Sequence, residues 1–351
     1  MNLEFKPDIF SDTLPKWRLA GAEFTNTIIE IFNSTQIEKA IFSDLLIEFS
    51  GAFEINSSNL RISFSGDKFV LKRWSHKAVP KQLEKLLQTM DWLASNNLPV
   101  PVPIKFINGN FINFCNNYYW SIFPFVEGHY FSGEGDELEA LAYITGILSK
   151  TLTKLPIELL PDSGPSHLSD SDDAIIQIME SEINNWPSMF GIEYSKLLKH
   201  QWDELKANWA RLRNESIYAG PVFPCHFDLH PHNILVNDGQ IVALLDFESL
   251  KMFPEGYCVG FNALKQCRQA VVKSFQRKSA RDIGNEYLQL LSRSNPKFES
   301  YIDKMSDLAN TEVMRRLCVI FRLNVESNDK SWNHILPIQL SHLKESKQLF
   351  T

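Results

Sequence analysis

Residues 225–247 read CHFDLHPHNILVNDGQIVALLDF and place three oxygen-bearing side chains, Asp228, Asn233 and Asp246, at the ends of two short apolar runs. Two short apolar runs flank the turn sequence at 237–240, which favours a tight hairpin with these side chains at its mouth. Hard cations such as Mg²⁺ prefer a few oxygen ligands and keep waters and substrate phosphates for the remaining positions. Phosphoryl transfer needs such a metal and one carboxylate directed at the attacking hydroxyl. The stretch therefore indicates metal-assisted chemistry on phosphate.

The composition is that of a globular protein with two lobes. A chain of 351 residues is longer than one ordinary domain. Hydrophobic residues make up 44% of it and aromatic residues 12%, which is enough to build a sizeable core. The net charge of −7 argues against binding to nucleic acid, which requires a basic surface. We therefore expect no nucleic-acid partner.

No segment predicts secretion or membrane insertion. Residues 1–8 lack a charged start followed by an apolar run, and the longest apolar stretches are far shorter than the roughly 20 residues of a membrane span. The five cysteines are scattered without a CxxC pair, which is typical of reduced thiols: Cys115, Cys225, Cys258, Cys267 and Cys318. We expect a cytoplasmic protein without disulfides, and its oligomeric state stays open.

The first third of the chain predicts strands around one main helix. Residues 1–40 have a helical apolar pattern, whereas 45–74 alternate as strands do. A helix that begins with a proline is expected over 80–95. The sequence Asn-Gly-Asn at 108–110 lies between apolar runs and predicts a hairpin, and 118–123 predicts a further strand.

After residue 128 the chain predicts mostly helices, apart from the hairpin within 233–247. The expected helices cover 136–154, 171–185, 193–214, 258–275, 280–292 and 298–325. We therefore expect an α+β fold of two lobes. The N-terminal lobe, over 1–126, has an antiparallel sheet with one main helix. The C-terminal lobe, over 127–351, is mostly helical with the catalytic hairpin. A cleft at their junction is the expected place of the site.

The sequence HFDLHPHNILV followed by ALLDFE resembles the signature of the aminoglycoside phosphotransferase and choline kinase superfamily, whose fold is similar to that of protein kinases. Typical members read H-G-D-[LI]-H-x-x-N-[IL]-[LF]-[VF] and, after a short turn, [IV]-D-[FW]-[ED]. The order of strands, lysine and helix extends the resemblance over most of the chain. It implies a kinase-like two-lobe fold and an ATP-dependent, Mg²⁺-dependent small-molecule kinase. The implied acceptor is a hydroxyl of an aminoglycoside, an amino alcohol or a sugar-like molecule.

The resemblance gives roles to the three oxygen-bearing side chains. Asp228 is the expected catalytic base, which orients the acceptor hydroxyl for in-line attack. Asn233 and Asp246 are the expected Mg²⁺ ligands. For each residue alone, the alternative is a turn or cap residue. His226 is expected to brace the loop backbone, and the histidines of this loop are spaced unlike those of a zinc site.

Lys72 matches the lysine that holds the α- and β-phosphates in the superfamily. Strand alternation places it on one face with Val70 and Trp74, so its ammonium needs an acidic partner, which we expect to be Glu84. Arg73 is the neighbouring competitor for the role. The alternative is that Lys72 is a solvated strand lysine and Glu84 an exposed helix residue.

The remaining nucleotide contacts are assigned by position. No GxGxxG is present, but the turn at 56–59 stands where the superfamily covers the phosphates. Its Ser57 and Ser58 are candidates because backbone N–H groups and hydroxyls can bind phosphate oxygens. Phe125 lies in the segment 123–128, which matches the linker whose backbone meets the adenine.

Two positions depart from the superfamily pattern. Phe227 stands where a small residue is usual, and Cys258 stands where an aspartate commonly buttresses the loop; a buried, apolar role is expected for Cys258. Glu248 either contacts metal or substrate or is a surface acid. These departures leave open a pseudokinase-like nucleotide-binding or scaffold protein. A third alternative is an atypical protein kinase, although the chain has no activation segment with an APE-like end.

The sequence does not identify the acceptor. The helical segments 171–214 and 258–325 would line its site. Three tryptophans, Trp186, Trp202 and Trp209, are either a cation–π box for a quaternary amine or ordinary core residues.

Overall fold

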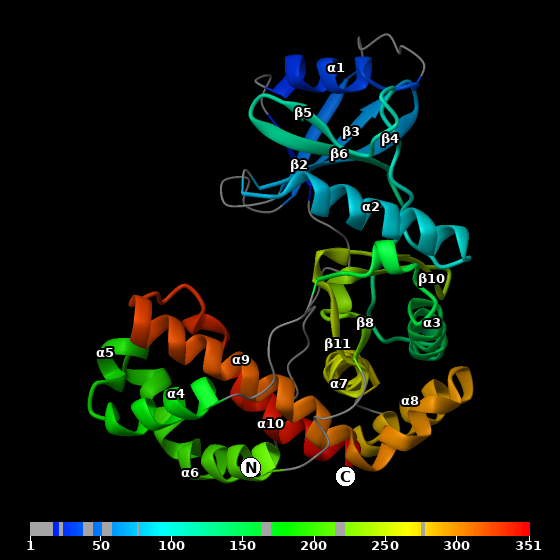
Figure 1. Cartoon of the computed structure of the whole chain (residues 1–351). Helices are drawn as coiled ribbons and strands as arrows, with labels where there is room; N and C mark the ends of the chain where they lie inside the picture. Colours follow the sequence, from blue (N-terminus) through cyan, green and yellow to red (C-terminus); the bar gives the residue numbers. More distant parts are fainter. Residues whose placement is uncertain are drawn as a thin grey trace.

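The computed structural model describes residues 17–20, 24–37, 45–50, 58–75, 77–162, 170–214, 222–274 and 278–351. Within these ranges, an antiparallel sheet with two helices forms one part of the molecule. A larger helical part carries two small sheets (Figure 1). This arrangement confirms the predicted α+β class, with the sheet in the N-terminal region and the helices in the C-terminal region.

The main sheet has six strands in the order β1-β2-β3-β4-β6-β5, and every neighbouring pair is antiparallel. The strands are β1 (Arg18–Leu19), β2 (Leu46–Ser50), β3 (Ser58–Phe64), β4 (Asp67–Arg73), β5 (Asn113–Cys115) and β6 (Tyr118–Pro124). The turn between β3 and β4 passes through Gly66, whose φ of +86° is readily adopted only by glycine. Of the helix predicted over residues 1–40, the described part is α1 (Thr25–Asn33), which follows β1.

The two faces of the sheet belong to different hydrophobic cores. Helix α1 shares one core with Leu71 of β4. Helix α2 (Pro80–Ser95), which begins and ends where the sequence predicts, shares the larger core with Trp74 just after β4. Because side chains alternate along a strand, Lys72 projects to the same side as Trp74. The lysine is thereby turned away from α1 and toward the helical part of the molecule.

The hairpin predicted around Asn108-Gly109-Asn110 is wrong in its pairing. The turn itself exists, since the Gly109 N–H donates to the carbonyl of Phe106 at 2.9 Å. Beyond the hydrogen bond from the Phe106 N–H to the Asn110 carbonyl at 2.8 Å, however, the flanking segments form no ladder with each other, because Phe106 bridges to Thr35 and β5 pairs with β6. The physical reason is burial: Phe106 enters the core beneath α1, whereas Phe111 enters the core that contains α2.

The helical part contains α3 (Glu137–Leu152), α4 (Asp170–Ser181), α5 (Trp186–Phe190), α6 (Ile192–Asn214), α7 (Glu255–Ser274), α8 (Ala280–Ser294), α9 (Met305–Ser327) and α10 (Leu336–Phe350). The six predicted helices are present with shifted ends. The segment predicted as one helix over 298–325 consists of a 3₁₀ helix, η7 (Pro296–Lys304), and then α9. Helix α10 has no counterpart among the predicted elements.

Two small sheets frame the stretch 225–247. Strand β8 (Val222–His226) pairs with β11 (Leu250–Pro254). The predicted hairpin is formed by β9 (Ile234–Asn237) and β10 (Gln240–Leu244), and β7 (His129–Tyr130) pairs with β9. Its turn, Asp238-Gly239, has positive φ angles at both residues, as a type I′ turn requires. The loop that contains Asp228 and Asn233 therefore connects β8 and β9, each of which is paired in a sheet.

Helices α7 and α9 cross at close range below this loop. The cause is Gly260 of α7, where an added Cβ would lie 2.7 Å from the backbone N of Ala309 in α9. The close crossing brings side chains of α9 next to the loop. Among the described helices, none combines the length and apolar character needed to cross a bilayer.

Candidate active site

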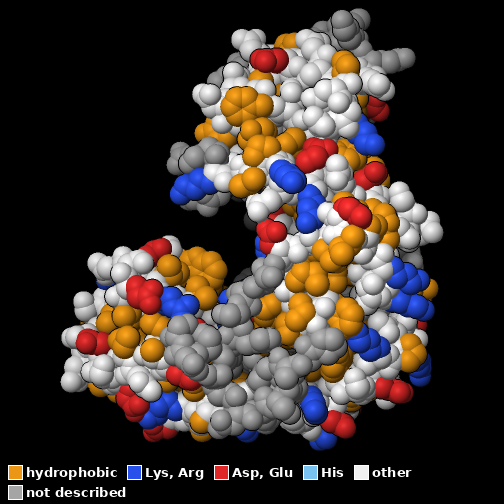
Figure 2. Space-filling model, viewed as in Figure 1, with side chains coloured by type: hydrophobic (Ala, Val, Ile, Leu, Met, Phe, Trp, Pro, Cys, Tyr) orange, Lys and Arg blue, Asp and Glu red, His pale blue; other side chains and the backbone are white. Residues whose placement is uncertain are grey.

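A cavity of about 570 Å³ lies between the main sheet and the small hairpin sheet. Four of the predicted site residues line it: Lys72 from β4, Phe125 after β6, Asn233 before β9 and Asp246 after β10. In the space-filling view, the surface is hollowed between the upper, sheet-containing part and the lower, helical part (Figure 2). Residues of the stretch 225–247 and Lys72, the lysine predicted to bind the nucleotide, therefore line the same cavity.

Lys72 reaches across this cavity. Its Nζ forms an ion pair with Glu248, lies 3.8 Å from Oδ1 of Asp246 and lies 4.4 Å from the centroid of the Trp74 ring. Its neighbour Arg73 stacks over the Tyr118 ring at 4.5 Å instead. Only Lys72 of these two cations lines the cavity.

The predicted ion pair between Lys72 and Glu84 is wrong. Both carboxylate oxygens of Glu84 accept from the backbone N–H of Phe111, each at 3.0 Å. That contact satisfies a main-chain donor next to a buried aromatic side chain, which would be costly to leave unpaired. The partner of Lys72 is Glu248, which the short 3₁₀ helix η6 (Phe247–Ser249) presents two residues after Asp246.

The structure describes the two serines predicted to bind phosphate, Ser57 and Ser58, to different extents. Ser57 lies outside the described residues. Ser58 is the first residue of β3 and pairs with Arg73 in the sheet, and its side chain lies outside the described part of the chain. Their assignment to phosphate binding stays a prediction.

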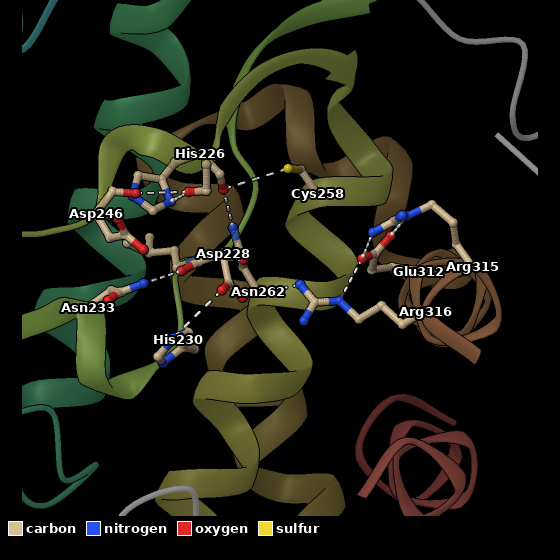
Figure 3. A network of polar contacts seen from close by, with 12 residues as sticks. His226, Asp228, His230, Asn233, Asp246, Cys258, Asn262, Glu312, Arg315 and Arg316 are labelled. Atoms are coloured by element: carbon tan, nitrogen blue, oxygen red, sulfur yellow. Dashed lines mark hydrogen bonds and ion pairs between the residues drawn. The ribbon is translucent and has the colours of Figure 1, made fainter. Parts of the chain in front are cut away.

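His226 ends β8 and is buried, and Figure 3 shows its ring close to Asp246. Its Nε2 lies 2.9 Å from the carbonyl of Leu245, so this nitrogen carries the proton, and Nδ1 lies 3.2 Å from the hydroxyl of Ser249. Its ring meets Phe247 edge-on. Burial lowers the pKa of His226 more than the nearby groups raise it, so the imidazole is neutral at pH 7. These contacts tie the loop to the segment that follows β10, which is the bracing that the sequence predicts.

Asp228 lies on the loop that follows β8, and it is not among the described residues that line the cavity. Its Oδ1 lies 3.2 Å from a terminal nitrogen of Arg316, and its Oδ2 lies 3.7 Å from Nε2 of His230. Burial alone would raise the pKa of the Asp228 carboxyl, but Arg316, His230 and Lys265 together hold the pKa below its usual value. Asp228 is therefore an anion at neutral pH and can accept a hydrogen bond from a hydroxyl.

Asn233 and Asp246 fit the requirements of a divalent cation. The Asn233 Nδ2 donates to the backbone carbonyl of Asp228 at 2.9 Å, which fixes the amide and leaves its Oδ1 available as a ligand. The Asp246 carboxylate is 45% exposed and lines the same cavity. One neutral and one charged oxygen that line the same cavity suit Mg²⁺, which retains waters and substrate oxygens.

A helix side chain that the sequence did not single out anchors the loop from below. The Asn262 side chain of α7 donates to the carbonyl of His226 and accepts from the N–H of Leu229, both at 3.0 Å. Gln266, one turn later, donates to the carbonyl of Leu229 at 3.1 Å. Cys258, at the position where an aspartate is common, directs its thiol to the same His226 carbonyl at 3.6 Å. Burial raises the pKa of Cys258 well above its usual value, so the residue is a buried thiol as expected.

Two adjacent arginines of α9 share one buried carboxylate. Arg315 donates to both oxygens of Glu312, at 2.7 and 2.8 Å, and the Nε of Arg316 donates to one of them at 2.7 Å. Arg315 stacks over Phe227, which explains how the loop accommodates a bulky side chain there. The spacing Glu-x-x-Arg-Arg could have indicated this cluster, because residues three and four apart are helix neighbours. Nothing in the sequence indicated the contact to Asp228, which lies 88 positions away.

Of the two alternatives for the three tryptophans, the structure supports ordinary core residues and not a cation–π box. Trp186 and Trp202 are buried and pack edge-on against each other at 4.9 Å. Trp209 is also buried, and its indole N–H donates to Asp173. Among the described residues, no group of three or more His, Cys, Asp or Glu side chains is arranged to hold a metal ion.

The family model described as "Phosphotransferase enzyme family" matches residues 52–257, well over half of the chain. The chain belongs to the phosphotransferase enzyme family. None of the curated proteins that were compared with this phosphotransferase matches it.

Solved structures similar to this phosphotransferase share its fold at low sequence identity. A spectinomycin phosphotransferase in complex with ADP and spectinomycin has 12% identity and a TM-score of 0.63, over 91% of this chain and 93% of that chain. An amicoumacin kinase in complex with AMP-PNP and Ca²⁺ has 11% identity and a TM-score of 0.60, over 93% and 94%. A choline kinase from Cryptosporidium parvum has 12% identity and a TM-score of 0.56, over 92% and 95%. These likenesses confirm the predicted kinase-like fold.

Proposed function

We propose that this phosphotransferase is an ATP-dependent kinase that transfers the γ-phosphate to a hydroxyl of a small molecule. What supports the proposal is the meeting of Lys72, Asn233 and Asp246 at one cavity with Asp228 beside it. The similar structures include kinases and phosphotransferases crystallised with ADP or AMP-PNP, which supports an adenine nucleotide as the donor.

Each side chain has a task in this reaction. Lys72 binds phosphate oxygens once it exchanges its partner Glu248 for them. Asn233 and Asp246 would hold Mg²⁺, which supplies neutralisation of the charge on the phosphate oxygens. Asp228 accepts a hydrogen bond from the acceptor hydroxyl and takes its proton as the oxygen bonds to phosphorus and ADP leaves. Since the Asp228 carboxylate is a weak base, its orienting role matters most.

The test is release of ADP from Mg²⁺-ATP in the presence of a panel of small hydroxylated acceptors. Asp228→Asn is expected to lower kcat by roughly 10²–10⁴-fold while leaving nucleotide affinity intact. Asp238→Asn is the matched control, because Asp238 is an exposed residue of the adjacent hairpin turn. Nucleotide binding without turnover on any acceptor would favour the pseudokinase alternative. Full turnover by Asp228→Asn would refute the role of Asp228.

A further inference from the structure

We propose that Trp17 contacts the base of the donor nucleotide and thereby favours donors that carry a large aromatic base. This inference rests on the proposed kinase function and adds a residue to its nucleotide site. Trp17 lies outside the region 52–257 that the family model matches. The contact would therefore be supplied by the segment that precedes the family region.

The first observation is that the N-terminal segment reaches the cavity. Trp17 lines the same cavity as Lys72 and Asp246. It directly precedes β1, whose Arg18 pairs with Phe49 of β2. This pairing adds β1 to the edge of the main sheet and fixes the backbone next to Trp17.

The second observation is the end of the cavity at which Trp17 lies. The centroid of its ring is 6.1 Å from that of Phe125, and the Phe125 N–H donates to the carbonyl of Lys68 at 3.0 Å. Lys68 precedes Lys72 by four residues on β4, which is roughly 13 Å at the rise of a strand. Trp17 is therefore remote from the predicted phosphate end and adjoins the segment 123–128, where the base is expected.

The third observation is that the Trp17 ring is already held in place. It meets the Phe125 ring edge-on, with 62° between the ring planes. The guanidinium carbon of Arg61 lies 5.0 Å from the centroid of the Trp17 ring and 5.4 Å from that of Phe125. Arg61 is itself fixed, because its Nε donates to Glu48 at 2.7 Å. A ring held in this way loses little conformational freedom when a ligand contacts it, which favours binding.

An aromatic ring at this end of the cavity suits a flat aromatic base. Bases bind to aromatic side chains through their π-faces, whichever base is present. Val70 of β4 and Leu235 of β9 line the same cavity, so apolar side chains are available from the sheet and from the small hairpin. A purine buries more apolar surface than a pyrimidine, and a polyphosphate without a base cannot make these contacts at all.

The experiment compares the affinities of Mg²⁺-ADP, Mg²⁺-UDP and Mg²⁺-tripolyphosphate, measured by calorimetry on the full-length protein. The variants are Trp17→Ala and Trp17→Phe. The matched controls are Trp332→Ala and Trp332→Phe, because Trp332 is 43% exposed in the helical part, just before the 3₁₀ helix η8 (Asn333–Ile335). The change in tryptophan emission on ADP binding is the second readout, since it reports on contact between the base and an indole ring.

Trp17→Ala should weaken the binding of Mg²⁺-ADP by roughly 5- to 150-fold, which is the effect of losing one base–aromatic contact. Mg²⁺-UDP should lose less, and Mg²⁺-tripolyphosphate should bind as before because Lys72 and the predicted metal ligands are retained. Trp17→Phe should keep most of the affinity for ADP but show a smaller emission change than the wild type. Both Trp332 variants should bind ADP like the wild type, with the emission change intact.

Unchanged ADP affinity in Trp17→Ala, or an equal loss for all three ligands, would overturn the inference. An undiminished emission change in Trp17→Phe would also overturn it, and this readout decides even if Trp17→Ala does not fold. A wild type that binds none of the three ligands would instead refute the kinase function, so the two failures are distinguishable.

Discussion

At the residue scale, Lys72 is a cavity-lining cation that already has a carboxylate partner. Its ammonium is bound to Glu248, lies near Asp246 and faces the Trp74 ring. A phosphate oxygen that approaches Lys72 has to displace a carboxylate or share the lysine with it. Glu248 therefore opposes the binding of a nucleotide that comes without metal.

This competition predicts the behaviour of Glu248→Gln. The change removes the resident anion but keeps the size of the side chain, so the affinity for ADP in EDTA should rise. The rise should not exceed about fivefold, since a solvent-accessible ion pair contributes at most about 1 kcal/mol. Titration with a fluorescent ADP analogue measures it.

The control is Glu286→Gln, which breaks the exposed Lys278–Glu286 ion pair of α8, remote from the cavity. Unchanged or weaker metal-free binding in Glu248→Gln alone would show that Glu248 does not compete for Lys72.

Sequence reasoning at this scale found the residues that a contiguous motif contains and missed those that folding brings in. Asp228, Asn233 and Asp246 lie within 19 positions, and the structure places them around one loop. The partner of Lys72 was missed because the alternation of a strand gives the face of a side chain but not the direction of its tip. Glu84 is the first acid of the helix that follows, whereas Glu248 is 176 positions away.

At the element scale, the loop 227–233 depends on helix α7 more than on its own turns. Asn262 binds a carbonyl and an N–H on either side of Asp228, so the loop conformation is fixed by a side chain of the helix. Gln266 extends this contact by one turn. Asn262 and Gln266 of α7 thus hold the loop backbone, whereas Cys258 contributes only a weak thiol donor.

Asn262→Leu is expected to leave the buried Leu229 N–H without this partner and the His226 carbonyl with only the weak Cys258 thiol donor. The free energy of unfolding should fall by about 1–3 kcal/mol. In addition, kcat should fall more than nucleotide affinity does, because the position of Asp228 changes while the cavity is retained. Steady-state kinetics and chemical denaturation measure the two effects.

Asn324→Leu is the matched control, since Asn324 is a buried amide that exchanges hydrogen bonds with Asn333, away from the loop. It should cost similar stability with unchanged kcat. Equal kcat losses in both variants would contradict a specific role of Asn262.

Elements were predictable where periodicity was strong and local. Helix α2 matches its prediction to the residue, because proline at its start and an unbroken apolar stripe define it. The pairing around Gly109 was not predictable, since it depends on which of two cores takes Phe106 and Phe111. Helix α10 was missed; its buried face carries polar residues such as Gln339, His342 and Glu345, which hide the apolar pattern.

At the scale of the whole molecule, α10 closes the helical part by packing against α7, α8 and α9. His342 of α10 is fully buried near Phe261, and neither ring nitrogen has a hydrogen-bond partner among the described residues. Burial, together with the nearby cations Arg268, Lys265 and Arg316, lowers the pKa of His342 well below its usual value. Protonation of this residue therefore disfavours the folded state.

The pH dependence of stability follows from this lowered pKa. The unfolded chain protonates His342 near its ordinary pKa of about 6.5, before the folded protein does, so stability falls as the pH drops below that value. The loss continues, by up to about 1.4 kcal/mol per pH unit, until the pH reaches the folded-state pKa. His342→Leu should flatten the decline of the free energy of unfolding between neutral and mildly acidic pH.

Only part of the decline should disappear, because buried His226 also has a lowered pKa. His200→Leu, at an exposed position of α6, is the control and should keep the wild-type slope. An unaltered slope in His342→Leu, measured by denaturant titration at each pH, would contradict the prediction.

The two-part architecture could be read from the sequence because strand-like and helical patterns segregate along the chain. The packing of α9 against the loop could not, because it results from the crossing of two helices at Gly260. That crossing places Arg316 beside Asp228.

The backbone at Asp246 lies in the left-handed region, with φ of 60° and ψ of 52°. Asparagine, aspartate and glycine tolerate this conformation, whereas most other residues pay roughly 1–2 kcal/mol for it. A descendant that lost the need for the carboxylate could thus drift to asparagine or glycine at low cost, but alanine or glutamate would also strain the chain. Asparagine is therefore the substitution at position 246 that removes the negative charge without adding backbone strain.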